Sequence, residues 1–174
     1  MIKEKVITQF MGRFDTPQKA WQASHSGDWM LWLAQRLNIN KRLLTLAKGK
    51  CAETVLHLMK DDRSKAAINA AIDYGNGLID DRQLTIVSCA AGGAAGELAE
   101  SSSAEFSAHA ADIASCLFGD SYYSAYYAAK ASAEANADSY YASTQPDEVA
   151  RKRNELTTAN ICRDILTESV FEKL

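Results

Sequence analysis

The sequence predicts an all-α protein, either a single-domain helical bundle or a set of stacked helix pairs, with about seven helices. Only two prolines, Pro17 and Pro146, interrupt the 174 residues, so nearly the whole chain is open to helices. Hydrophobic residues make up 47% of the chain, and no stretch alternates with the two-residue period of a strand. A chain of this length can bury one sizeable core, and we therefore expect one domain over residues 1–174.

Most of the predicted helices begin near a residue that can cap them. Serine, threonine, asparagine and aspartate accept hydrogen bonds from the amide groups of a helix's first turn, and proline suits the first helical position. In chain order the predicted helices are 17–23 after Thr16, 28–37 after Ser26, a longer one after Asn38 or Asn40 that continues to Met59, 62–72 after Asp61, one that starts at Asp80, a weakly apolar one over 98–118, a tyrosine-rich one over 120–143 and a closing helix over 147–172.

Glycines indicate where these helices end. The segment 75–77, Gly-Asn-Gly, predicts a strong stop, and 119–121, Gly-Asp-Ser, predicts the turn before the tyrosine-rich helix. Gly49 is a place where the longer helix can bend. The three glycines within 92–96 leave two alternatives open, namely a break in the helix or a point where two backbones pack closely.

Charge divides the chain into a basic front and an acidic back. Residues 1–60 form a Trp- and Leu-rich basic part, in which residues 1–50 carry nine Lys or Arg against three Asp or Glu. The Ala- and Tyr-rich part, 90–145, is acidic, because nine carboxylates stand against the single cation Lys130 between Glu97 and Glu148. Such a stretch is either a solvated helix face or a surface that attracts a basic protein. Nucleic acid is disfavoured, since phosphates require clustered Lys and Arg.

Six of the seven tyrosines occur as adjacent pairs in the acidic part. The pairs are Tyr122-Tyr123, Tyr126-Tyr127 and Tyr140-Tyr141. At about 100° per residue the pairs form two neighbouring stripes on one helix face. That face predicts either rings packed into alanine grooves or an exposed binding surface, because tyrosine is enriched where proteins bind proteins. From charge and aromatic pattern, the candidate partner-binding residues are Glu97, Glu100, Glu105, Asp112, Tyr122 and Tyr126.

One constellation has the residue types of a metal site or a general base. Its members, spaced to share one helix face, are Glu105, His109, Asp112 and Cys116. The face borders an apolar stripe and no HExxH motif accompanies it, so we interpret it as the rim of a packing surface. His25 lies beside two serines, which alone is weak support for acyl transfer. We therefore predict no catalytic residue, no metal and no cofactor, and an enzyme built on this face remains an alternative.

The remaining composition indicates a cytoplasmic protein. No apolar run approaches eighteen residues, and no basic-then-apolar stretch opens the chain, so neither a membrane span nor a secretory signal is expected. The cysteines lack the CxxC spacing of metal and redox motifs. We interpret them as four buried thiols: Cys51, Cys89, Cys116 and Cys162.

The most distinctive pattern lies near the N-terminus. Segment 20–23, Ala-Trp-Gln-Ala, is followed by 27–34, Gly-Asp-Trp-Met-Leu-Trp-Leu-Ala. With the Ala- and Tyr-rich middle and the closing Ile-Cys-Arg-Asp-Ile-Leu of 161–166, this order of elements resembles the bacterial immunity protein family five, found beside polymorphic toxins. On physical grounds we interpret one group as a structural core motif, with the tryptophans as anchors and the aspartate supporting a helix start: Trp21, Gly27, Asp28, Trp29 and Trp32.

The resemblance implies an all-α protein without catalysis of its own that binds and neutralises a toxin of the same system. Combined with the acidic, tyrosine-bearing face, it predicts an inhibitor that occludes the active region of a basic toxin or defence effector. Two further alternatives stay open, a phage-encoded inhibitor of a bacterial defence complex and a structural module that self-associates through the tyrosine face. A homo-oligomer is compatible with each of these, whereas direct binding to nucleic acid or membrane is not expected.

Overall fold

The computed structural model describes residues 8–97, 102–135 and 147–174, which fold into helices joined by short connections and contain no strand. The all-α prediction is confirmed. In chain order the elements are α2 (Pro17–Ala23), α3 (Gly27–Arg36), α4 (Lys41–Glu53), the 3₁₀ helix η1 (Leu56–Leu58), α5 (Asp62–Gly75), α6 (Asp81–Gly96), α7 (Ser103–Ser115), α8 (Tyr123–Glu134) and α9 (Glu148–Phe171). Within the described ranges, no helix has both the length and the apolar character needed to cross a membrane.

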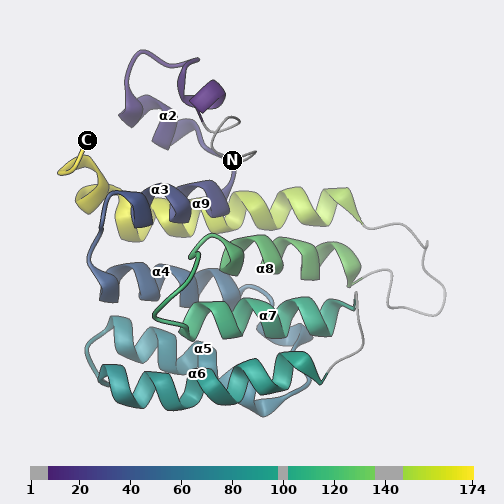
Figure 1. Ribbon diagram of the computed structural model, residues 1–174. Helices are drawn as coiled ribbons and strands as arrows, with labels where there is room; N and C mark the ends of the chain where they lie inside the picture. Colours follow the sequence, from purple (N-terminus) through teal and green to yellow (C-terminus); the bar gives the residue numbers. More distant parts are fainter. Residues whose placement is uncertain (1–7, 98–101, 136–146) are drawn as a thin grey trace.

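The helices stack in layers around α4, which packs against α3, α5, α7, α8 and α9 (Figure 1). At one edge of the stack, α6 packs on α5 and α7, while α2 lies at the opposite edge near α9. The basic and acidic parts of the chain are therefore not separate in space. Helix α4 belongs to residues 1–60, and its neighbours α7 and α8 belong to residues 90–145.

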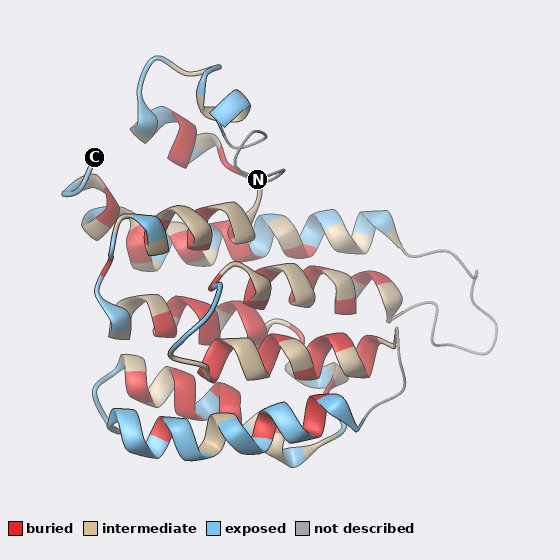
Figure 2. Cartoon of the chain, viewed as in Figure 1, coloured by how far each residue is buried: buried red, intermediate tan, exposed pale blue. Residues whose placement is uncertain are grey.

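Two main clusters of buried side chains fill the space between the helices, as the buried segments of Figure 2 show. The first, the tryptophan cluster, joins α2, α3, α4, α8 and α9 and contains Trp21 and Leu166. The second, the alanine cluster, joins α4, η1, α5, α6, α7 and α8 around Ile68 and Phe106. Most of its other members are alanines, whose small side chains let the helices approach closely.

Most of the predicted caps are confirmed. Asn40 Oδ1 accepts a hydrogen bond from Arg42 N at 2.9 Å, and Asp80 forms a reciprocal capping box with Gln83. Thr16 and Asp61 also accept amide hydrogen bonds at helix starts, as predicted, and so do Ser102 and Asp147, which were not predicted as caps. These bonds span at most three residues, which is why local sequence predicts them well.

The cap predicted at Ser26 is wrong in its chemistry. Ser26 does precede α3, but its side chain makes no capping hydrogen bond. Its hydroxyl instead donates to the carboxylate of Asp28, and that carboxylate accepts a hydrogen bond from Trp29 N at 2.9 Å. Asp28 therefore supports the start of α3, as expected, through its side chain and its position in the first turn.

The longer helix ends earlier than predicted. Helix α4 stops at Glu53, and the expected continuation to Met59 is a turn that contains η1. At this end the Thr54 hydroxyl donates to the carbonyl of Cys51 at 2.7 Å. No bend is needed at Gly49, because this glycine lies where α4 meets α5 and a Cβ there would be 3.1 Å from that of Ala71. Close packing, rather than flexibility, accounts for the glycine.

Helix α6 is continuous from Asp81 to Gly96, so the predicted alternative of a break at its glycines is wrong. A Cβ on Gly92 would lie 3.4 Å from Asp112 Oδ1 of α7, which is ordinary contact. Helix α8 is described from Tyr123 to Glu134, and the rest of the predicted tyrosine-rich helix, with Tyr140 and Tyr141, lies outside the described residues. The closing helix α9 agrees with its prediction.

The prediction of four buried thiols is correct for two of them. Cys51 of α4 and Cys162 of α9 are fully buried, with their Sγ atoms 3.9 Å apart. Cys89 on α6 is exposed and Cys116 is half-buried. The difference follows from packing, because α6 turns one face away from the rest of the molecule and Cys116 follows the last residue of α7.

Candidate functional site

The carboxylates predicted to bind a partner lie in different environments. Glu97, next to the end of α6, forms an ion pair with Arg63 of α5 at 2.6 Å, and this neighbour lowers its pKa. Glu105 and Asp112 lie on the same face of α7, and burial raises the pKa of Asp112. Glu100 lies outside the described residues. Compensation by Arg63 makes this region less acidic than its sequence alone indicates.

The possible metal or base constellation is only partly assembled. Glu105 Oε1 lies 3.5 Å from His109 Nε2, one turn apart on α7. Cys116 follows the end of α7 with extended backbone, and its thiol donates to the carbonyl of Phe118, so it does not continue the helical face. Among the described residues no group of three or more His, Cys, Asp or Glu is placed to hold a metal ion.

The paired tyrosines form an aromatic cluster with two residues of α7. We define this aromatic cluster as Phe106, His109, Tyr122, Tyr123, Tyr126 and Tyr127. The Tyr127 ring stacks on His109 with centroids 5.2 Å apart and on Phe106 with centroids 6.2 Å apart. Lys130 Nζ lies over the Phe106 ring, 4.1 Å from its centroid, and contributes a cation–π contact.

The aromatic cluster combines the two predicted roles of the tyrosines. Phe106 is buried, whereas His109 and the four tyrosines are half-buried, so each tyrosine packs through part of its ring and keeps part in contact with solvent. Burial raises the pKa of Tyr127, and it does the same for Tyr122. Both phenols therefore stay protonated at neutral pH and can donate hydrogen bonds to a partner.

A cleft of about 440 Å³ opens beside this cluster, where the start of α3 meets α8 and α9. Its volume is in the range of binding sites for small groups. Three aromatic rings, two carboxylates, one guanidinium and one imidazole face it. The lining residues are Phe10, His25, Ser26, Gly27, Asp28, Trp29, Ala125, Tyr126, Ala129, Arg151, Glu155 and Thr158.

Gly27 is required by the way this cleft is built. A Cβ at this position would lie 2.5 Å from Thr158 Oγ1 and 2.8 Å from the Thr158 carbonyl carbon, closer than real contacts allow. The missing side chain lets the start of α3 touch α9. This contact places Asp28 and Trp29 opposite the side chains that project from α9.

The core interpretation of the tryptophans holds for Trp21 alone. Trp21 is 2% exposed, and its Nε1 donates to Thr167 Oγ1 at 2.8 Å. Trp29 and Trp32 are half-buried, which corrects their assignment as core anchors. Trp32 carries Arg36 over its ring at 5.2 Å, while Trp29 meets Phe10 edge to face at 5.3 Å and lines the cleft.

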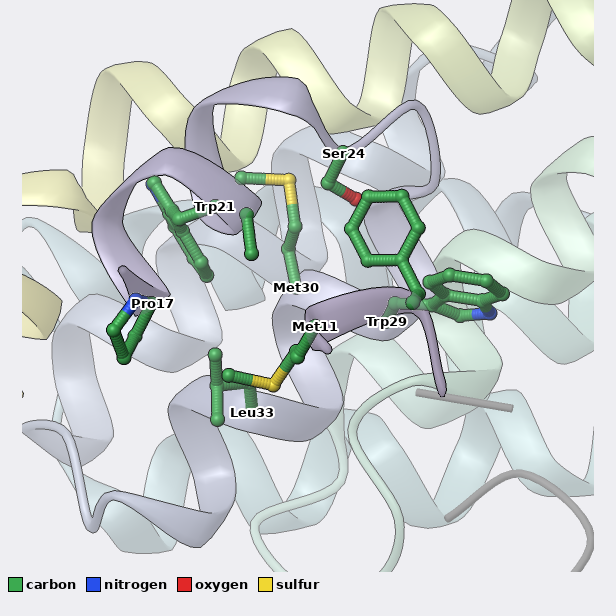
Figure 3. A pocket seen from close by; sticks show the side chains of 9 residues that line it. Met11, Pro17, Trp21, Ser24, Trp29, Met30 and Leu33 are labelled. Atoms are coloured by element: carbon green, nitrogen blue, oxygen red, sulfur yellow. The ribbon is translucent and has the colours of Figure 1, made fainter. Parts of the chain in front are cut away.

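Behind Trp29 lies a smaller apolar pocket of about 30 Å³, formed with Trp21, Met30 and Leu33 (Figure 3). This volume is about that of one water molecule in the liquid, so the pocket holds no larger group as it stands. Trp29 lines both this pocket and the cleft. Its ring is thereby supported by packed side chains on one side and available on the other.

The cleft's charged groups hold one another in place. Arg151 Nε donates to Glu155 Oε1 at 3.1 Å, and its Nη1 lies 3.5 Å from Glu148 Oε1. These three side chains are neighbours on one face of α9. A carboxylate can accept further hydrogen bonds beyond those it makes here, so Glu155 and Asp28 can each accept one from a cationic group in the cleft.

No family model, curated protein or solved structure matches the chain. The likeness to immunity protein family five thus stays a prediction.

The sequence analysis singled out some of the residues that line the cleft, and it gave two of them a structural role only. Tyr126 was expected at a binding surface, whereas Asp28 and Trp29 were expected to be structural. Arg151 and Glu155 were not singled out, and their spacing of four residues is common on solvated helices. Only the contact between α3, α8 and α9 brings these cleft residues together, and no local pattern in the sequence predicts that contact.

Proposed function

We propose that this protein is a non-catalytic, immunity-type inhibitor that binds a basic toxin or effector protein and occludes its active region. The observation that carries the proposal is the continuity between the aromatic cluster and the cleft. Tyr126 belongs to both, since its ring lies 5.4 Å from that of Tyr127 and also lines the cleft beside Trp29. Half-exposed aromatic rings around a cleft are typical of residues that dominate binding between proteins.

The chemistry of the cleft favours a basic side chain of the partner. The ring of Trp29 can attract a cation through its negative face, at about 0.5–2 kcal/mol, as the Tyr126 ring already does with Lys130 Nζ, 5.8 Å from its centroid. Asp28 and Glu155 add carboxylates that a lysine or arginine can reach. Glu105 supplies a third carboxylate beside the aromatic cluster, next to His109. These groups support a surface that selects for positive charge.

Co-expression tests the proposal directly. The partner used is the product of the gene adjacent to the one that encodes this chain, expressed alone and together with it. Arrested growth without the chain, restored growth with it, and a 1:1 complex in calorimetry are expected. We expect the double variant Tyr123→Ala/Tyr126→Ala to raise the dissociation constant of the complex at least tenfold, because each truncated hot-spot tyrosine costs about 1 kcal/mol or more of binding free energy.

Leu78→Ala is the matched control, since Leu78 is 71% exposed in the turn between α5 and α6, away from the cleft. It should bind as the wild type does. Added salt should slow association if charge attracts the partner. Equal affinities of wild type and the double tyrosine variant would contradict the assigned surface. If the double tyrosine variant without the partner formed smaller oligomers than the wild type, self-association through the tyrosines would instead be favoured.

A further inference from the structure

Helix α6 has an exposed face that no other described helix covers. Its opposite side is buried against α5 and α7 through Leu84, Ala91, Ala94 and Ala95. Figure 2 shows α6 at the edge of the stack, mostly in the colour of exposed residues. At helical spacing, the outer face carries Arg82, Ile86, Cys89, Ala90, Gly93 and Glu97, all of them exposed.

Two features of this face are unexpected for a surface that meets only water. Ile86 is 64% exposed. Near it, the described residues give no packing reason for glycine at two positions of the helix. Among these residues, a Cβ on Gly93 would meet only the end of the Arg63 side chain, at 3.7 Å, and a Cβ on Gly96, the last residue of α6, would meet nothing within 4 Å. Glycine in a helix costs about 1 kcal/mol relative to alanine, so an external close contact would explain it better than the fold does.

Residues at equal distances from the midpoint of this face complement each other in charge and in size. That midpoint falls between Cys89 and Ala90. About that point, the cation Arg82 is the counterpart of the anion Glu97, and the large Ile86 is the counterpart of Gly93, which has no side chain. A surface whose two halves complement each other in charge and in shape fits a second copy of itself turned through 180°.

We propose that α6 packs antiparallel against α6 of a second copy of this chain, across a two-fold axis beside Cys89 and Ala90. Ile86 of each copy fills the space over Gly93 of the other, and Arg82 of each copy pairs with Glu97 of the other. Glu97 can accept this bond in addition to the one from Arg63, because a carboxylate has about four acceptor positions. The contact is isologous and closes at two copies.

The size of the face sets the strength of the dimer. A helix of 16 residues is about 24 Å long, and one face of it buries less than the roughly 800 Å² per partner of a standard interface. We therefore expect a dimer that forms reversibly, with a dissociation constant on the order of 10–100 µM. The cleft is formed by α3, α8 and α9, so both copies of a dimer keep their clefts open.

Sedimentation equilibrium between 5 and 500 µM tests the dimer without any other partner. The mean mass of the wild type is expected to rise over this range from nearer that of the monomer to nearer that of the dimer. Ile86→Asp removes the apolar contact and Gly93→Leu fills the space that receives it, so both variants should stay monomeric with unchanged circular dichroism. Val149→Asp, at an apolar residue of α9 that is 67% exposed, is the control and should dimerise as the wild type does.

Two further variants test the orientation of the helices. Arg82→Glu should weaken the dimer at least tenfold, and Arg82→Glu/Glu97→Arg should restore part of it, because the swap regenerates the pairs between the two copies but removes the ion pair of Glu97 with Arg63. A bismaleimide should cross-link the wild-type dimer, and Cys89→Ser should abolish the cross-link. A chain that remains monomeric at 500 µM, or a dimer that survives both Ile86→Asp and Gly93→Leu, would overturn the proposal. Neither result bears on toxin binding through the cleft, which uses other helices.

Discussion

Lys48 is the residue whose environment differs most from what its type favours. It is 4% exposed, and its Nζ donates to the carbonyls of Ile113 at 3.1 Å and Cys116 at 2.6 Å. These carbonyls belong to the end of α7, where a cation is favourable because the helix dipole is negative there. Burial nevertheless lowers the pKa of Lys48 to about 8, with the neighbouring Cys116 acting in the opposite direction.

This pKa predicts an unusual dependence of stability on pH. Between pH 8 and the ordinary lysine pKa of 10.5, the unfolded chain holds a proton on Lys48 that the folded chain has lost. The free energy of unfolding therefore rises with pH in this window, by about 2 kcal/mol from pH 7.5 to 9.5. Urea unfolding at several pH values measures it, as the difference between the wild type and Lys48→Met.

Lys152→Met is the matched control, because Lys152 is exposed on α9. This variant should keep the rise that Lys48→Met loses. Parallel pH curves for the wild type and Lys48→Met would show that the buried amine is not the source of the effect.

At the level of residues, sequence predicts what is local. Asn40 was recognised as a cap and residue 147 as the start of the closing helix, because the cap bonds of Asn40 and Asp147 span two or three residues. Lys48 counted only as one of the cations of the basic front, since its burial depends on α7, more than sixty residues later. The meeting of Tyr126 with Trp29 has the same origin. Long-range packing decides which polar residues face solvent, and the periodicity of the sequence does not predict that packing.

At the level of elements, sequence predicted where the helices start better than where they end. Most starts have a side-chain cap, whereas α6 continues through its glycines because Ala91, Ala94 and Ala95 hold the helix against its neighbours. Packing of this kind outweighs the low helix propensity of glycine, about 1 kcal/mol per residue. The early end of α4 likewise follows from tertiary contacts, with Asn154 Nδ2 donating to Thr54 Oγ1 at 2.9 Å.

The cap of α9 gives a prediction at this level. Asp147 Oδ1 accepts hydrogen bonds from Val149 N at 2.9 Å and Ala150 N at 3.0 Å. Asp147→Ala should lower the free energy of unfolding by about 1 kcal/mol, as caps of this type generally do. Asp147→Asn keeps the acceptor oxygen and should recover most of the loss. Urea unfolding at pH 7 measures both, and equal losses in the two variants would show that charge, and not the cap bond, is what matters.

At the level of the whole molecule, the two main clusters share helices and should unfold together. Helix α4 contributes Cys51 to the tryptophan cluster and Ala52 to the alanine cluster, and α8 contributes Ala125 and Ala128 in the same way. Neighbouring residues on one helix cannot lose their packing independently. This arrangement is the physical basis for expecting one cooperative unit, as the sequence predicts.

The distribution of tryptophan allows this cooperativity to be measured. Trp21 is in the tryptophan cluster, and Trp29 and Trp32 lie on α3 beside it, so tryptophan fluorescence reports on that half of the molecule. Far-ultraviolet circular dichroism reports on every helix. Ile68 is fully buried in the alanine cluster, where Ile68→Ala leaves a cavity and should cost about 2–5 kcal/mol.

In one cooperative unit, Ile68→Ala moves the fluorescence and circular dichroism transitions to lower urea by the same amount, on the order of 1–2 M. Leu166→Ala, which leaves a cavity in the tryptophan cluster, should move both transitions in the same way. If Ile68→Ala shifted circular dichroism but left the fluorescence transition in place, the clusters would unfold separately. The tryptophan cluster and the cleft that borders it would then form a unit of their own, stable without α5 and α6.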